Sequence, residues 1–136
     1  MTASHIPRVL LACTPQGLPI FRGILTDVEL VPALTEDEAL KHLEDDFDLI
    51  LCSMQFDESR MLDFLVAAKK RSPDIPFLCC RVLESELPQR SFTAAITAAK
   101  NAGAQGLVDV PILEREFGIE NAHHLFRRII GASLIR

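Results

Sequence analysis

The chain has 136 residues, of which 49% are hydrophobic, and it carries a formal net charge of −5. This length and apolar content predict a single domain over residues 1–136, with a core from about residue 7 to about residue 133. The acidic balance disfavours a nucleic-acid surface, which is usually basic. No apolar run approaches the roughly 20 residues of a membrane-spanning helix, so we expect no membrane contact.

The N-terminal segment and the cysteines indicate the compartment. Residues 1–8 lack the charged stretch and long apolar run of a signal peptide. The chain has four cysteines, Cys13, Cys52, Cys79 and Cys80, and no two of them are spaced as Cys-x-x-Cys. Cys79 and Cys80 are neighbours in a strand pattern and point to opposite faces, so they cannot serve one site. We expect buried core cysteines, no thiol–metal cluster and a reducing, cytoplasmic setting.

Apolar runs alternate with helical patterns along the whole chain. In chain order the patterns predict a strand over 8–13, a helix over 18–25, a strand over 28–34, a helix after Thr35, a strand over 48–52, a helix over 58–71, a strand over 75–80, a helix over 91–102, a strand over 106–110 and a helix over 121–132. Five strands alternating with five helices predict an α/β fold: a three-layer α-β-α sandwich around a five-stranded parallel sheet.

Local signals support several of these elements. Thr35 and Glu38 form a capping box, in which the Thr35 hydroxyl accepts from the Glu38 backbone and the Glu38 side chain reaches back. Pro32 indicates an edge or irregular position for its strand. Gly103 is a typical left-handed end for the helix before it. The loop over 82–90 is unusually long and polar.

Six segments resemble, in the right order, the receiver domain of bacterial response regulators, the CheY-like family. They are residues 8–12, 35–40 (like "GEEAL"), 46–51 (like "PDLIL"), 72–76, 99–104 (like "EAGA") and Pro111, which falls where a receiver has the proline of its Lys-Pro pair. The resemblance covers nearly the whole chain and implies a flavodoxin-like topology with a cytoplasmic signalling role. It also implies a cis peptide bond between Val110 and Pro111.

The resemblance places the phosphorylation pocket on unsuitable residues. A working receiver holds Mg²⁺ with an acidic pair after its first strand and an Asp that ends its third and attacks phosphorus. A Ser or Thr after the fourth strand and a Lys after the fifth then bind the phosphoryl oxygens. Here these positions are occupied by Cys13 and Thr14, Ser53, Arg81 and Val110, in that order, and Leu107 replaces the aromatic switch residue. We therefore expect a degenerate pocket with no catalytic residue, metal or cofactor.

Two alternatives remain open at this pocket. Asp57 follows Ser53 by four positions and would be the phosphoacceptor if the alignment slipped, although the metal ligands near Cys13 would still be missing. Arg81 would lie at the ligand-binding edge of an open α/β sheet and could hold a small or nucleotide-like anion. The competing interpretation of Arg81 is an ion pair with a local acid such as Asp57 that fills the vacated pocket.

We expect a non-enzymatic receiver-like domain that is not phosphorylated on Asp and acts on a protein partner or as a homodimer in two-component-type signalling or a phosphorelay. The chain ends soon after its last helix, so we expect any output to pass through that partner. The resemblance implies an interaction face on the last two helices and the fifth strand, with the apolar candidates Phe92, Ile96, Leu107, Phe117, Leu125 and Phe126. His123 and His124 diverge by about 100° on a helix, so we expect no shared metal.

Overall fold

The computed structural model describes residues 6–84 and 89–134, with side chains from residue 93 onward in the second stretch. In chain order the elements are β1 (Arg8–Ala12), α1 (Leu18–Ile24), β2 (Glu29–Ala33), α2 (Glu36–His42), β3 (Leu49–Ser53), α3 (Phe56–Ser59), α4 (Met61–Arg71), β4 (Phe77–Arg81), α5 (Gln89–Asn101), β5 (Leu107–Asp109), α6 (Val110–Phe117) and α7 (Ile119–Ser133).

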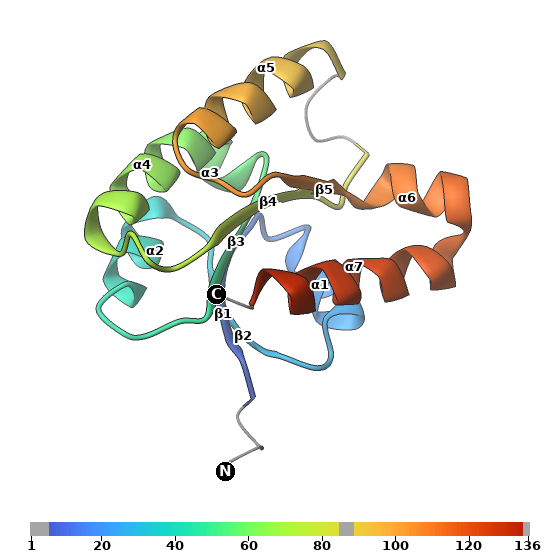
Figure 1. The fold of residues 1–136 in the computed structure, drawn as a ribbon, viewed down its shortest axis with the longest axis horizontal. Coiled ribbons are helices and arrows are strands. Elements are labelled where there is room, and N and C mark those ends of the chain that lie inside the picture. The colour runs from blue at the N-terminus through green and yellow to red at the C-terminus, as the bar shows by residue number, and fades with distance from the viewer. Residues whose placement is uncertain (1–5, 85–88, 135–136) are drawn as a thin grey trace.

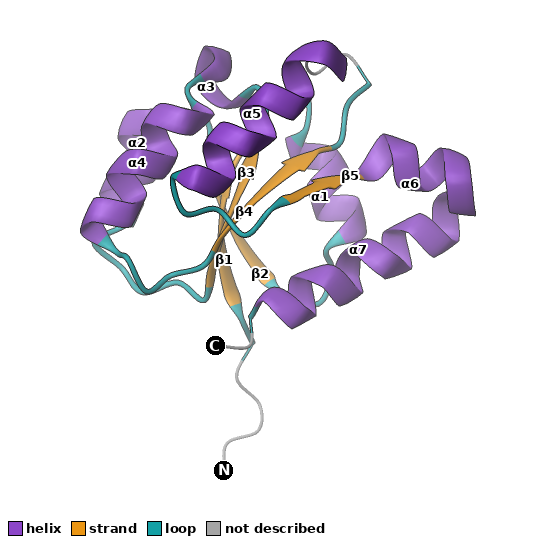
Figure 2. Cartoon of the chain, turned by 45° about the horizontal axis from the view of Figure 1, so that its top comes forward, coloured by secondary structure: helices purple, strands orange, loops and turns teal. Residues whose placement is uncertain are grey.

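The five strands form one parallel sheet in the order β2-β1-β3-β4-β5. Helices cover both faces of this sheet, so the predicted α/β sandwich is confirmed (Figure 2). Pro32 lies in β2, an edge strand, where its missing N–H costs no hydrogen bond to a second neighbour. The strand order reverses direction between β1 and β3, and the crevice beside such a reversal is where ligands bind in open α/β sheets.

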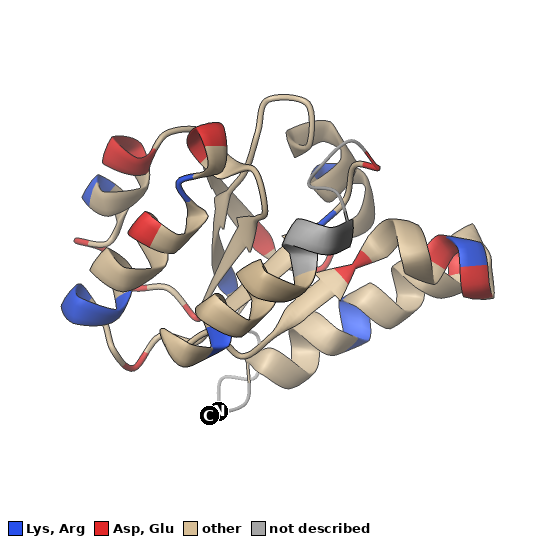
Figure 3. Ribbon diagram, turned by 90° about the horizontal axis from the view of Figure 1, so that it is seen from above, with Lys and Arg blue, Asp and Glu red and all other residues tan. Residues whose placement is uncertain are grey.

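Two buried apolar clusters hold the layers together, one on each face of the sheet. The first contains side chains of α2, α3, α4 and α5, such as Phe64, and the second contains side chains of α1, α6 and α7, such as Phe126. Cys79 belongs to the first cluster and Cys80 to the second, because neighbours on a strand point to opposite faces. Most of the sheet ribbon carries no charged residue, and most of the charges lie on the helices and loops (Figure 3).

The capping box of α2 forms in a modified way. Thr35 Oγ1 accepts a hydrogen bond from Glu38 N at 3.2 Å, as expected of an N-cap. The Glu38 side chain reaches back one residue further and accepts from Leu34 N at 2.8 Å. Both contacts anchor the start of α2 to the end of β2.

The chain between β5 and the last helix departs from the prediction. The region after Asp109 forms the extra helix α6, for which the Asp109 side chain is the N-cap. The expected cis bond between Val110 and Pro111 is wrong, because no cis peptide bond occurs among the described residues. Proline in the first helical turn has a suitable φ and needs no amide hydrogen, so a trans chain passes directly from β5 into α6.

The helix expected over 58–71 is interrupted at its start. Asp57, Glu58 and Ser59 all have positive φ angles, of 46°, 56° and 71°. They form the short α3, and the regular helix α4 begins only at Met61. Three successive non-glycine residues in the left-handed region are uncommon and cost backbone energy. This turn places Asp57 beside the end of β1 and the start of α2.

Candidate functional site

Except for Thr14, the predicted pocket positions at the carboxyl ends of the strands are buried. Cys13 and Val110 belong to the apolar cluster beneath α1 and α7 and are 0% and 1% exposed. Ser53, at the end of β3, is also only 1% exposed, and its register partner on β4 is Cys80. The structure therefore brings Cys13, Ser53 and Val110 to one edge of the sheet but leaves no opening to them.

The Ser53 hydroxyl is the most unusual group at this edge. Its Oγ atom is buried and has no hydrogen-bond partner among the described residues. A buried hydroxyl without a partner costs stability, since it has lost its hydrogen bonds to water. With neither a base nor a cation beside it, this hydroxyl is not activated as a nucleophile.

Thr14 has a local structural task. Its Oγ1 accepts a hydrogen bond from Gly17 N at 3.1 Å, which shapes the turn between β1 and α1. A Cβ at Gly17 would lie only 3.3 Å from that oxygen, so a larger residue there would crowd the turn. Thr14 is half-buried and lies on the solvent side of Cys13.

Arg81, at the end of β4, is engaged by its own surroundings. Its Nη1 donates to Asp109 Oδ1 at 2.9 Å, and its Nη2 donates to the carbonyl oxygen of Glu84 at 2.7 Å. The suggested pairing with Asp57 is wrong. Asp109 is the register partner of Arg81 on the adjacent strand β5, so the two side chains leave the sheet at the same level.

Asp57 is committed to a different contact. Its Oδ2 accepts a hydrogen bond from Glu36 N at 2.8 Å, in the first turn of α2. A carboxylate in that place satisfies an amide that has no partner within the helix and complements the helix dipole. One oxygen of the Asp57 carboxylate is therefore already engaged at the start of α2.

A hollow that the sequence did not reveal lies outside this closed edge, and we call it the switch-point pocket. It has a volume of about 560 Å³ and lies beside the reversal between β1 and β3. Its lining comes from the segments that follow β1, β2 and β3: Thr14, Pro15, Gln16, Leu34, Gln55, Asp57, Glu58 and Ser59. Sequence reasoning missed it because the turn at Asp57 was assigned to the approach of a regular helix.

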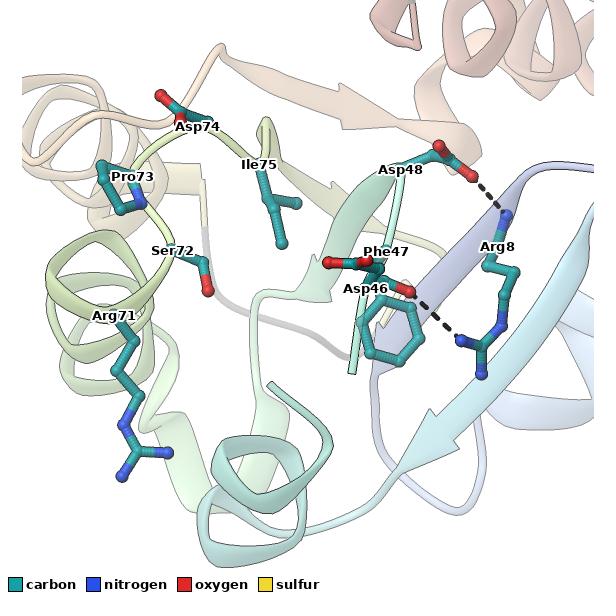
Figure 4. Close-up of a pocket in the computed structure, with 9 residues that line it drawn as sticks. All are labelled: Arg8, Asp46, Phe47, Asp48, Arg71, Ser72, Pro73, Asp74 and Ile75. Atoms are coloured by element: carbon teal, nitrogen blue, oxygen red, sulfur yellow. Dashed lines mark hydrogen bonds between the residues drawn. The ribbon is translucent and has the colours of Figure 1, made fainter. Parts of the chain in front are cut away.

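A second hollow, of about 680 Å³, lies at the opposite, amino-terminal edge of the sheet (Figure 4). Several charged residues of its lining make contacts within the protein. Arg8 Nη1 donates to the carbonyl oxygen of Asp46 at 3.1 Å, and its guanidinium lies 4.9 Å from the centre of the Phe47 ring. Asp48 Oδ2 accepts from Arg8 N at 2.8 Å, and Arg71 donates to the carbonyl oxygen of Leu40 at 2.9 Å.

The candidate interaction residues differ widely in exposure. Ile96, Leu107 and Leu125 are partly buried, and Phe117, at the end of α6, is 51% exposed. Phe126 is wrong as a surface residue: it is fully buried in the second cluster, with its ring 6.4 Å from that of Phe21. It recurs with Ala122 and Ile130 on the core face of α7. The side chain of Phe92 lies outside the described part.

None of the four cysteines forms a disulfide, and all four are buried. Burial raises the pKa of the Cys79 thiol from its ordinary value of 9.0 to about 12, because an apolar environment disfavours the thiolate. A protonated buried thiol is a poor nucleophile and a poor metal ligand. The four cysteines therefore pack as small apolar side chains.

Nowhere in residues 6–84 and 89–134 do three His, Cys, Asp or Glu side chains lie close enough together to hold a metal ion. His123 Nε2 lies 2.6 Å from Glu114 Oε2, and so joins α7 to α6, whereas His124 is exposed. None of the helices within the same ranges is both long enough and apolar enough to cross a membrane.

Several solved structures with this arrangement of elements are response regulators. The chain superposes on the phosphorylated cyanobacterial phytochrome response regulator RcpA with a TM-score of 0.72, at 12% identity over 96% of each chain. It superposes on a CheY-like receiver domain protein from Methanospirillum hungatei JF-1 with a TM-score of 0.68, at 20% identity over 94% of each. The chain has the receiver fold.

A third similar structure is the receiver domain of a Francisella response regulator, with a TM-score of 0.62 at 17% identity, covering 90% of this chain and 98% of that one. No protein-family model matches the sequence, and no curated protein matches it. At 12–20% identity these solved structures share the fold with this chain.

Proposed function

We propose that this chain is a pseudo-receiver: a cytoplasmic, non-enzymatic signalling domain that is not phosphorylated on aspartate and acts through protein–protein contacts. The receiver fold suggests a place in two-component-type signal transduction. The observation that carries the proposal is the closed strand edge, where Cys13, Ser53 and Val110 are each 1% exposed or less. None of these three side chains is a carboxylate, and a phosphoryl donor would find no entry to them.

Metal binding at this edge is unsupported by the chemistry of the side chains. Mg²⁺ prefers hard oxygen ligands in an octahedral arrangement, usually including carboxylates. The positions that would supply them in a receiver hold a thiol at Cys13 and hydroxyls at Thr14 and Ser53. The nearest aspartate in sequence, Asp57, already accepts a hydrogen bond from Glu36 N.

The Arg81–Asp109 pair gives a second line of support. In a phosphorylated receiver the residues at the ends of the fourth and fifth strands would both contact the phosphoryl group. Here the ends of β4 and β5 are joined directly, by an ion pair whose side chains are 10% and 11% exposed. We propose that this contact keeps the domain in one arrangement without a phosphoryl group. It also weakens the alternative that Arg81 recruits a small anion.

The interaction face is proposed on α5, β5 and the α6–α7 pair. Phe117 and Ile119 flank the corner between α6 and α7 and are 51% and 65% exposed. Large apolar side chains exposed together are typical of protein contact surfaces. We propose that a partner protein, or a second copy of this chain, covers that corner.

The direct test is incubation of the purified chain with acetyl phosphate and Mg²⁺, followed by intact-mass measurement. A phosphorylatable receiver in the same reaction serves as the positive control. We expect the mass of this chain to stay unchanged while the control gains one phosphoryl group. A phosphoryl adduct on Asp57 would overturn the proposal in favour of an ordinary receiver with a displaced site.

A further inference from the structure

The switch-point pocket has a lining whose charge is of one sign. Asp57 and Glu58 are its acidic members, and no Lys, Arg or His within the described part of the chain belongs to the lining. Arg60, the nearest base in sequence, pairs with Glu36 at 3.8 Å outside the pocket. An anion such as a phosphate would meet two negative charges and no cation, so the pocket selects against it.

The carboxylates are also positioned to accept hydrogen bonds from a ligand. Asp57 Oδ2 accepts from Glu36 N, and a carboxylate has further lone pairs on its two oxygens with which to accept from a ligand. Glu58 is exposed and forms no ion pair among the described residues. The Asp57 contact holds this turn against the start of α2, so the acceptor geometry exists before any ligand arrives.

The size of the pocket decides between kinds of cation. At about 560 Å³ it falls within the range of organic-ligand sites and is far larger than a bare ion needs. Gln16, whose side chain is a carboxamide, belongs to the same lining. A guanidinium or ammonium group has several N–H donors, and these match a site rich in oxygen acceptors.

We propose that the switch-point pocket binds the basic side chain, arginine or lysine, of a protein partner. This inference rests on the proposed function, because it names the chemistry by which a protein-binding domain recognises its partner. The planar guanidinium of arginine, which carries five N–H donors, suits the paired carboxylate and carboxamide oxygens best. The pocket lies on the strand-tip side of the molecule, and is separate from the apolar corner at Phe117.

The test is a titration of the ¹⁵N-labelled full chain, followed by amide chemical shifts. The probe is the peptide acetyl-Gly-Arg-Gly-amide, and its control replaces arginine with citrulline, which has nearly the same shape without the charge. We expect saturable shifts at the amides of Thr14, Gln16 and 55–59 with the arginine peptide only. Equal shifts with the citrulline peptide, or none with either, would overturn the inference.

Variants connect the binding to the two carboxylates. Asp57→Asn with Glu58→Gln removes both charges but keeps an oxygen that can accept from Glu36 N, so the turn is retained. We expect this double variant to bind the arginine peptide about tenfold more weakly, since charge-assisted hydrogen bonds are lost. Glu44→Gln with Asp45→Asn changes two exposed acids outside the pocket and should leave binding unchanged. Undiminished binding by the Asp57/Glu58 variant would refute the assignment.

A free amine is the competing occupant, and putrescine tests it. Putrescine that binds more tightly than the peptide would assign the pocket to small amines and overturn the choice of a protein partner. The proposed function fails separately, through a phosphoryl adduct. A chain that gains no phosphoryl group and binds no arginine peptide would therefore keep the proposed function and lose only this inference.

Discussion

Arg81 and Asp109 join the tips of β4 and β5 by an ion pair of 2.9 Å that is almost hidden from solvent. The same Asp109 oxygen also accepts from Ile112 N at 3.3 Å and so begins α6. Arg81 in turn holds the carbonyl oxygen of Glu84, in the segment that follows β4. One pair of side chains therefore determines how two strands, one loop and one helix meet.

Removing one member of this pair should cost far more stability than removing both. We expect Asp109→Ala to lower the free energy of unfolding by about 3 kcal/mol, because it leaves the buried Arg81 charge without a partner. The double variant Arg81→Met with Asp109→Ser removes the charge and keeps a hydroxyl that can cap α6. Urea unfolding should show the double variant to be more stable than Asp109→Ala. Equal losses would mean that the ion pair contributes little.

Removing the unpartnered hydroxyl of Ser53 should increase stability, in contrast to removing Asp109. Ser53→Ala should raise the free energy of unfolding by about 1 kcal/mol, because it removes a buried polar atom that makes no hydrogen bond. Ser53→Asp should be strongly destabilising, because it buries a charge in an apolar cluster, and it should not confer phosphorylation. Thermal melts of both variants measure this. A destabilised Ser53→Ala would show that the hydroxyl has a partner in solution.

Phe126 on α7 is buried and Phe117 on α6 is exposed, so substitutions at these two positions should have contrasting effects. Phe126→Ala should lower the free energy of unfolding by about 3–5 kcal/mol, since it opens a cavity against Phe21 in the core. Phe117→Asp should change it by no more than about 0.5 kcal/mol, as is usual for exposed positions. If the apolar corner joins two copies, Phe117→Asp should also reduce self-association in sedimentation velocity. Unaltered self-association would remove Phe117 from the interface.

The cysteines provide a prediction about pH. The raised pKa of Cys79, about 12, means that the folded chain keeps this proton after the unfolded chain has lost it. Stability is therefore fully present below the ordinary thiol pKa, near 9, and falls as the pH rises from there toward 12. Cys79→Ala should flatten that decline in urea titrations. A decline identical to that of the parent chain would assign it to other groups.

Reagent accessibility checks the same burial independently. At pH 8 a thiol-specific reagent such as DTNB should react slowly with the native chain and with all four cysteines after unfolding in urea. Rapid reaction of a native thiol would show that the strand edge opens.

The strands were predictable because their side chains are apolar on both faces. Runs such as Leu49–Ser53 are buried throughout, and only the sheet of an α/β fold requires that pattern. The buried face of α7 could also be predicted from the sequence, because Ala122, Phe126 and Ile130 recur at helical spacing. This spacing predicts that Phe126 is buried, whereas the receiver resemblance placed it on the interaction face.

Two local features could not be predicted from apolar patterning. The sequence at the start of α6 has the signals of a helix N-terminus: Asp109 as the N-cap and Pro111 in the first turn. The receiver resemblance instead implied a cis peptide bond before Pro111, which is not compatible with a helix starting there. The left-handed turn at Asp57, Glu58 and Ser59 contains no glycine, proline or asparagine to mark it. It depends on the tertiary contact with Glu36 N, and the switch-point pocket depends on the turn.

The most direct measurement of the central claim is the amide spectrum of the ¹⁵N-labelled chain with Mg²⁺ and beryllofluoride, a phosphoryl mimic. The closed edge at Cys13, Ser53 and Val110 predicts a spectrum unchanged from that of the free chain at every added concentration. Saturable shifts at Ser53, Arg81 and Val110 that require both Mg²⁺ and beryllofluoride would contradict the account and show a functioning phosphorylation site.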